Sequence, residues 1–91
     1  MPGAKIKLIQ FTPYFLRSYN KLPKNIQELA KERSRIFQEN PFDARLHTHK
    51  LKGELYGSWS FSVNYQYRIL FRFLSSNEAI YYDIGHHEIY R

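Results

Sequence analysis

The sequence contains no cysteine, which excludes disulfide bonds, thiolate metal sites and cysteine nucleophiles. It has no apolar run near the roughly 20 residues that a membrane-spanning helix requires. The segment from Met1 to Lys5 lacks the apolar core of a secretory signal. A chain of 91 residues without disulfides suits the reducing cytoplasm. We therefore expect a soluble, cytoplasmic protein with a single domain over residues 1–91.

Acidic residues are scarce, with 8 against 14 basic ones and a formal net charge of +6. The whole excess lies in residues 1–35, because residues 36–91 carry equal numbers of each sign. This asymmetry indicates an anionic partner, with nucleic acid ahead of a membrane surface. Charge alone leaves open the alternative of a small basic protein without a specific ligand.

Two helices are predicted in the first half of the chain. Thr12 supplies an N-cap hydroxyl and the proline after it suits the first helical position. A short helix should follow, bury Phe15 and Tyr19, and end before Pro23. Residues 24–39 should form a longer helix, because one face carries mostly apolar residues at helical spacing. That face is made of Ile26, Leu29, Ala30, Arg33, Ile36 and Phe37.

Strands are predicted from alternation and from β-branched or aromatic residues. They are residues 5–11, 58–64, 67–74 and 79–84. The second should be half-buried, with Trp59, Phe61 and Val63 toward the core. Residues 41–58 should be a loop with at most a short turn of structure. The order indicates an α+β fold: an N-terminal strand, a helical hairpin, then an antiparallel strand meander that forms a small twisted sheet.

Three groups of residues can carry chemistry once the strands are placed. His47 to Gly53 precede the central strand, Arg68 begins the next one, and Gly85 to Arg91 follow the last. They offer imidazoles, cations and a phenol, a set that suits RNA cleavage by the neighbouring 2′-hydroxyl. This reaction needs a base, an acid and cations for the phosphorane. It needs no metal, and the sequence lacks the carboxylate cluster of a two-metal nuclease.

Other interpretations of these residues stay open. Arg68 can instead pair with Asp83 across adjacent strands. Tyr56, Tyr65 and Tyr67 flank loops, where they can stack on bases or simply be exposed. A metal site is a further alternative, although its candidate ligands do not have a fixed helical spacing. Its ligands would be His47, His49, His86 and His87.

Four segments, taken in order, carry a resemblance to a known family. They are His49-Lys50-Leu51-Lys52-Gly53, Trp59-Ser60-Phe61-Ser62-Val63, Tyr67-Arg68-Ile69-Leu70 and Asp83-Ile84-Gly85-His86-His87-Glu88-Ile89-Tyr90. The series resembles the RelE/ParE superfamily of bacterial toxins, and most nearly the RelE and YafQ type of messenger-RNA interferase. The resemblance implies a type II toxin that enters the ribosomal A site and cleaves messenger RNA there without a cofactor. It also implies a cognate antitoxin as partner.

The resemblance implies roles for individual residues. His49 matches a histidine that takes part in acid–base chemistry, and Arg68 matches a strand arginine that contacts the scissile phosphate. His87 matches the catalytic histidine near the C-terminus, and Tyr90 matches the aromatic residue that orients the substrate.

Further positions are assigned to RNA binding. Lys50 and Lys52 lie where RelE-like members place catalytic or phosphate-binding lysines. The C-terminal interval before Tyr90 is shorter than in many relatives, so His86 and His87 compete for the catalytic role.

The basic helical hairpin should dock on ribosomal RNA while the sheet handles the transcript, because the net charge and the chemistry lie in different parts of the chain. Lys24, Lys31 and Arg35 are the expected contacts. The superfamily also contains ParE-type toxins that inhibit DNA gyrase without nuclease chemistry. Gyrase inhibition is therefore the alternative function.

Overall fold

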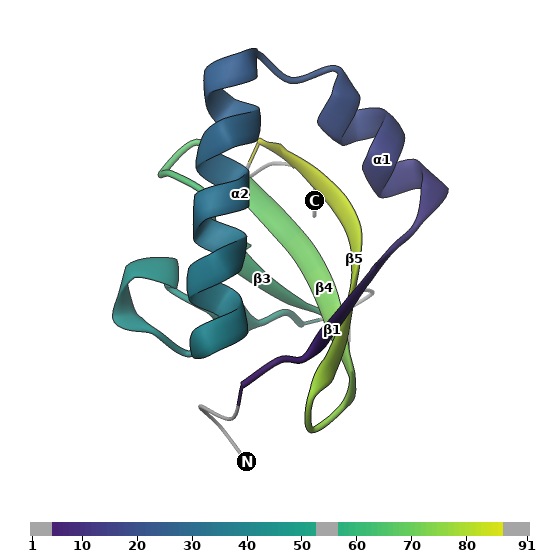
Figure 1. The fold of residues 1–91 in the computed structure, drawn as a ribbon, viewed down its shortest axis with the longest axis vertical. Helices are drawn as coiled ribbons and strands as arrows, with labels where there is room; N and C mark the ends of the chain where they lie inside the picture. The colour runs from purple at the N-terminus through teal and green to yellow at the C-terminus, as the bar shows by residue number, and fades with distance from the viewer. Residues whose placement is uncertain (1–4, 53–56, 87–91) are drawn as a thin grey trace.

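The computed structural model describes residues 5–52 and 57–86. Its elements follow in the order β1 (Leu8–Phe11), α1 (Pro13–Asn20), α2 (Lys24–Glu39), the 3₁₀ helix η1 (Ala44–Leu46), β2 (His49–Lys50), β3 (Trp59–Ser62), β4 (Tyr67–Ser75) and β5 (Glu78–His86). Figure 1 shows α2 lying across the strands, with α1 beside β5. Within the described ranges, no helix is both long and apolar enough to cross a membrane.

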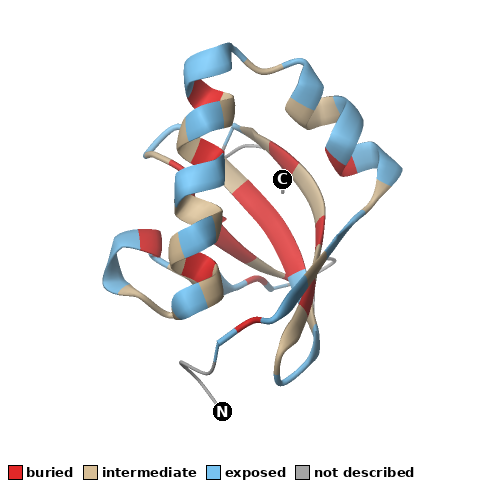
Figure 2. Cartoon of the chain, in the orientation of Figure 1, coloured by how far each residue is buried: buried red, intermediate tan, exposed pale blue. Residues whose placement is uncertain are grey.

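The two helices begin where local chemistry predicts. Thr12 caps α1, because its side-chain oxygen accepts from the backbone N–H of Phe15 at 2.9 Å. The helix α2 has the predicted bounds, and Ile26, Ala30 and Phe37 are its buried residues. In Figure 2 the buried positions of α2 face the buried central strands, so the helix covers one face of the sheet.

The strands form one sheet in the order β1-β5-β4-β3-β2. The pairs β2–β3, β3–β4 and β4–β5 are antiparallel, which confirms the predicted meander. The strand β1 pairs with β5 in parallel, from Leu8 opposite Glu78 to Phe11 opposite Tyr81. Alternation in the first strand does not indicate its partner, whereas the parallel pair requires a long connection, which the helical hairpin and meander provide.

An aromatic cluster forms the core between α2 and the sheet. The ring centroid of Phe37 lies 4.8 Å from those of both Phe61 and Phe71, and 5.7 Å from that of Tyr81. The hydroxyl of Tyr81 lies 2.8 Å from Ser34 Oγ, so this buried phenol keeps a hydrogen-bond partner. Burial raises the pKa of Tyr81, and the group stays neutral at physiological pH. Of the residues predicted to be buried, Phe15, Phe61 and Val63 are buried, whereas Tyr19 and Trp59 are half-buried and pack against the core.

Two expectations about the middle of the chain were incomplete. The strand β3 is not half-buried, because Ser60 and Ser62 are buried as well as Phe61, and Ser58 just before the strand is buried too. The predicted loop over residues 41–58 contains η1 and β2. Leu46 anchors η1, since its side chain is fully buried in the core cluster. Phe42, Ala44 and Leu46 alternate with polar residues, a pattern that does not indicate a helical turn.

Candidate functional site

The turn between β3 and β4 is fixed by one side chain. Asn64 Oδ1 accepts from the backbone N–H groups of Gln66 and Tyr67, each at 2.8 Å. The N–H of Val63 closes the turn by donating to the Tyr67 carbonyl at 2.9 Å. Tyr65 projects from this turn and is 84% exposed. These hydrogen bonds therefore order the turn and hold the residues beside it in place.

Arg68, at the start of β4, is oriented by this turn. Its Nη1 donates to the carbonyl oxygens of Asn64 at 2.7 Å and Tyr67 at 3.4 Å. Its Nε is buried and has no partner among the described residues. The alternative pairing with Asp83 is wrong, because the Asp83 carboxylate accepts from Ser18 Oγ and from the N–H of Ile84 instead.

A second arginine contacts the same turn from the helix side. Arg33 of α2 donates from Nε to the Val63 carbonyl at 3.1 Å. Two guanidinium groups, Arg33 and Arg68, thus bond to the carbonyls of consecutive residues, Val63 and Asn64. In the described part of the chain neither arginine forms an ion pair, so both positive charges remain uncompensated by contact.

These arginines line an open cavity of about 480 Å³, which we term the β3–β4 pocket. Its lining residues are Arg33, Arg45, His47, Ser62, Val63, Asn64, Tyr65 and Arg68. Arg33 and Arg45 were assigned no functional role from sequence, and His47 and Tyr65 entered only as alternatives, the one as a metal ligand and the other as a base-stacking residue. Arg33 carried a signal, because it is the charged residue on the otherwise apolar face of its helix.

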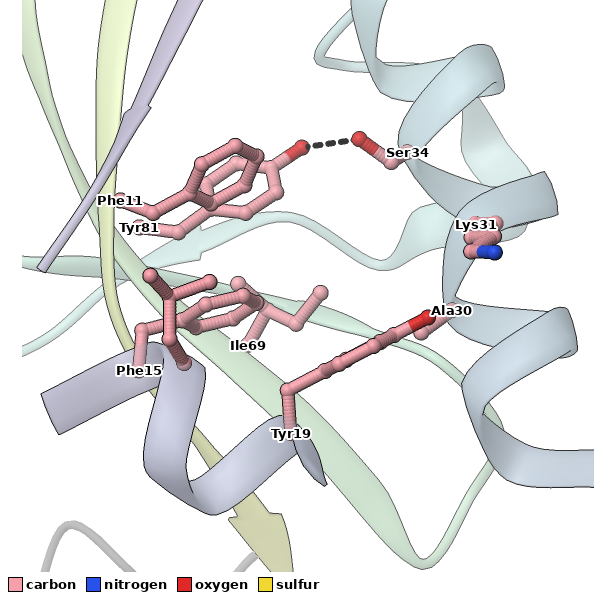
Figure 3. A pocket seen from close by; sticks show the side chains of 9 residues that line it. Phe11, Phe15, Tyr19, Ala30, Lys31, Ser34, Ile69 and Tyr81 are labelled. Carbon is pink, nitrogen blue, oxygen red and sulfur yellow. Dashed lines mark hydrogen bonds between the residues drawn. The ribbon is translucent and has the colours of Figure 1, made fainter. Parts of the chain in front are cut away.

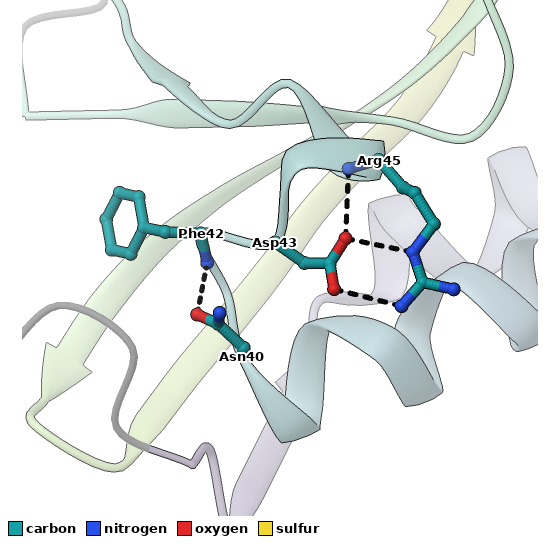
Figure 4. Close-up of polar contacts among 4 residues, drawn as sticks. All are labelled: Asn40, Phe42, Asp43 and Arg45. Carbon is teal, nitrogen blue, oxygen red and sulfur yellow. Dashed lines mark hydrogen bonds and ion pairs between the residues drawn. The ribbon is translucent and has the colours of Figure 1, made fainter.

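Arg45 also lines the pocket, but its positive charge is paired with Asp43. Its Nε and Nη2 donate to the two carboxylate oxygens of Asp43 at 2.9 Å each (Figure 4). These hydrogen bonds lower the pKa of Asp43 to about 2. Asn40 Oδ1 accepts from the N–H of Phe42 at 2.9 Å, so two side chains order the segment before η1. His47 then ends η1 with a positive φ of 50°.

His49 lies on β2 with both ring nitrogens in contact. Nδ1 lies 3.0 Å from the His47 carbonyl, and Nε2 lies 3.4 Å from Ser60 Oγ. A carbonyl only accepts, so Nδ1 carries the proton and Nε2 is the basic nitrogen of the neutral ring. The register pairs His49 with Ser60 and Arg68 with Ser62. Alternation on β3 therefore places His49 and Arg68 on the same face of the sheet.

The lysines do not join this pair. Lys50 pairs with Trp59, and its Nζ lies 5.8 Å from the centroid of the Trp59 ring, a cation–π distance. Since it follows His49 on the strand, Lys50 lies on the opposite face. Lys52 is exposed just beyond β2. Their expected role at the phosphate stays a prediction.

The end of β5 approaches the start of β4. Gly85 is in register with Arg68, and His86 with Tyr67. The His86 and Tyr67 rings meet edge-on with centroids 4.8 Å apart. His87 and Tyr90 lie outside the described residues, so the choice between the two histidines stays open. In the described ranges no group of three or more His, Asp or Glu side chains is placed to hold a metal ion.

The three cations expected to contact ribosomal RNA lie along α2. Lys24, Lys31 and Arg35 are all exposed, and their spacing places them on one side of the helix. Arg33 points instead to the β3–β4 turn. The helix therefore presents cations in two directions.

Comparison with known proteins bears on the fold. No protein-family model and no curated protein matches the sequence. Solved structures do match, and bacterial toxins are among them. The YoeB/ParE toxin from Agrobacterium tumefaciens superposes with a TM-score of 0.74 at 19% identity, over 87% of this chain and 96% of that one. YafQ from E. coli gives a TM-score of 0.72 at 16% identity, over 87% and 91% of the two chains.

A toxin–antitoxin complex is among these matches. The chain from RelBE2 of Mycobacterium tuberculosis superposes with a TM-score of 0.74 at 23% identity, over 94% of this chain and 93% of that one. The protein therefore has the fold of the RelE, YoeB and YafQ toxins. The fold expected from the sequence resemblance is confirmed.

Proposed function

We propose that this protein is the toxin of a toxin–antitoxin pair and acts in the cytoplasm as a ribosome-dependent endoribonuclease. It would enter the ribosomal A site, cleave messenger RNA there and so inhibit translation. One observation carries the proposal: Arg68, with a buried unpartnered Nε, lies on the same sheet face as His49, whose Nε2 is its basic nitrogen. The fold shared with RelE and YafQ supports it.

The proposed reaction is attack of the 2′-hydroxyl on the adjacent phosphate. The O2′–P bond forms and the P–O5′ bond breaks, leaving a 2′,3′-cyclic phosphate and a 5′-hydroxyl. His49 Nε2 takes the 2′ proton, and the Arg68 guanidinium stabilises the added negative charge of the phosphorane. His87, or His86 in its place, donates the proton to O5′, and Tyr90 orients the substrate. No step requires a metal or another cofactor.

The proposed antitoxin site is an apolar groove of about 220 Å³ between α1 and α2 (Figure 3). Phe11 and Leu16 line it and are nearly half exposed, and Lys31 lies at its rim. An amphipathic segment with acidic residues would bury these apolar groups and pair with the cation. The RelBE2 match, which is a toxin–antitoxin complex, supports a partner of this kind.

A matched pair of variants tests that site. Leu16→Glu should weaken binding of the proposed antitoxin, and Leu74→Glu should not. Leu16 and Leu74 are 45% and 48% exposed, and only Leu16 lines the groove. Equal binding by both variants would assign the antitoxin to another surface.

The nuclease function is tested by single-turnover cleavage of ribosome-bound messenger RNA, with a DNA gyrase supercoiling assay in parallel. We expect cleaved transcripts with 2′,3′-cyclic phosphate ends and unchanged supercoiling. Intact transcripts together with inhibited supercoiling would replace the nuclease by the ParE-type gyrase inhibitor.

A further inference from the structure

The β3–β4 pocket combines cationic donors with an exposed aromatic ring. Arg33 and Arg68 each use only part of the guanidinium on the turn carbonyls, so other N–H groups remain to bind an anion. Planar arginine forks bind phosphate oxygens in pairs. Because both guanidinium groups are already oriented by carbonyls of one ordered turn, little further ordering is needed when a phosphate binds.

The charge balance of the pocket favours an anion. Asp43 neutralises Arg45 through the paired contact, and Glu32 lies close enough to raise the pKa of the Arg45 guanidinium further. Arg33 also helps to lower the pKa of Asp43 but forms no ion pair with it, so the unpaired positive charge belongs to Arg33 and Arg68, which both line the pocket. An anion placed there meets two cations and no lining carboxylate among the described residues.

Tyr65 distinguishes this pocket from a plain anion site. It lines the pocket, it is 84% exposed, and it projects from the turn whose carbonyls orient the two arginines. An aromatic face beside a phosphate-binding arginine is how proteins bind single-stranded nucleic acid, since an unpaired base can stack on the ring. Large aromatic residues elsewhere in β3 and β4 pack into the core, whereas Tyr65 packs on nothing that buries it.

We propose that the β3–β4 pocket binds one nucleotide of single-stranded RNA outside the cleavage position, with its phosphate on Arg33 and its base stacked on Tyr65. Arg68 would lie between this nucleotide and the scissile phosphate and contact both. The proposal rests on the proposed function for the identity of the ligand as RNA. It adds a binding subsite that anchors the strand beside the reacting bond.

The experiment measures binding of a short single-stranded RNA in which every ribose is 2′-O-methylated, so that 2′-hydroxyl attack cannot occur. Fluorescence anisotropy is recorded over a range of salt concentrations. Tyr65→Ser should weaken binding by at least about fivefold, the lower end for loss of one stacked base. Arg33→Gln should reduce the salt slope by about 0.7, as for one lost phosphate contact on a single strand.

A second tyrosine–arginine pair gives the control. Tyr14 is 57% exposed, and Arg17 lies 5.8 Å from the centroid of its ring, away from the pocket lining. Tyr14→Ser and Arg17→Gln should both bind within about twofold of the parent. The Tyr65→Ser variant should also bind duplex RNA like the parent, because paired bases are not free to stack on a side chain. Thermal melts confirm folding, and Tyr65→Ser decides the test if Arg33→Gln does not fold.

The outcomes separate this inference from the proposed function. Binding by Tyr65→Ser within about twofold of the parent overturns the subsite, even if the parent cleaves ribosome-bound messenger. Equal weakening by the Tyr14→Ser control also overturns it. Conversely, a parent that binds RNA through Tyr65 and cleaves no transcript on the ribosome keeps the subsite and loses the nuclease function.

Discussion

Arg68 donates from Nη1 to the Asn64 carbonyl at 2.7 Å, so the second residue of β4 secures the turn that precedes the strand. The same guanidinium keeps a buried Nε without a partner in the described residues. The Arg68 guanidinium is thus held in place through Nη1, while its Nε–H has no acceptor among the described residues. Its placement differs from that of Arg72 on the same strand, which is exposed.

The first prediction follows from this arrangement. Arg68→Ala should lower single-turnover cleavage of ribosome-bound messenger by about 10²–10³-fold, as for loss of a donor to a developing oxyanion. Arg68→Lys should recover only part of the rate, because an ammonium cannot bond the Asn64 carbonyl and also present a planar fork. Arg72→Ala is the matched control and should stay within about threefold of the parent.

One result would contradict the assignment of Arg68 and His87 to catalysis. If Arg68→Ala and His87→Ala both melt like the parent and cleave within about threefold of it, the catalytic assignment is wrong, because threefold is less than about 1 kcal/mol of barrier.

A second prediction concerns the base. His49→Ala should lower the same single-turnover rate by about 10²–10⁴-fold, the range for loss of a general acid or base. His49 is exposed on the two-residue strand β2, so its truncation should leave the melting temperature nearly unchanged. A normal rate in a folded His49→Ala variant would remove the residue from the mechanism.

A third prediction concerns the buried phenol of the core. Ser34→Ala should destabilise the fold by about 1–3 kcal/mol, because it leaves the Tyr81 hydroxyl buried without its partner at 2.8 Å. Tyr81→Phe should cost less, about 0.5–1.5 kcal/mol, since Ser34 is only half-buried and can turn to water. Urea unfolding of both single variants and of the double variant measures the coupling. Additive losses would show that the contact contributes nothing.

A fourth prediction concerns pH. The pKa of Asp43 is lowered to about 2 in the folded protein, below the value of about 3.9 in an unfolded chain. The carboxylate therefore contributes stability above about pH 4, and this contribution is lost as the pH falls toward about 2. The melting temperatures of the parent and Asp43→Asn should differ at neutral pH and converge in acid. Added salt should shrink the difference, because the pair with Arg45 is exposed.

A fifth prediction tests the basic side of α2. Replacing Lys24, Lys31 and Arg35 with glutamate should weaken ribosome binding steeply at moderate salt, because phosphate contacts release counterions. All three side chains are exposed, so the fold should persist. Ribosome pelleting at several salt concentrations measures the effect, and unchanged binding would assign docking to another surface.

Sequence patterns predicted those parts of the fold that depend on near neighbours. The bounds of α2 follow from flanking prolines and from apolar residues at helical spacing, and the structure agrees with them. The parallel pairing of β1 was not predictable, because alternation reports a strand and not its partner. The burial of Ser58 and Ser60 was missed for a similar reason: polarity indicates an exposed face only when nothing covers that face.

The candidate site, like the fold, could be predicted from the sequence only in part. Their residue types identified His49 and Arg68 as candidates for acid–base chemistry and phosphate binding. That both lie on the same face of the sheet depends on the register across β2, β3 and β4. The pairing of Arg33 with the β3–β4 turn joins residues 30 positions apart, which no local pattern reveals. His87 and Tyr90 remain predictions from the resemblance.

The position of β1 has a consequence for the timing of folding. Thr12 bonds through Oγ1 to the Tyr82 carbonyl, 70 residues later, and β1 has β5 as its strand partner. During translation the first strand therefore leaves the ribosome long before its partner exists, and contacts of such sequence separation form late. The positively charged first third of the chain would be synthesised early, but its strand β1 would pair last. The protein would thus complete its sheet only after β5 has been synthesised, so a nascent chain that stops short of β5 lacks the finished fold.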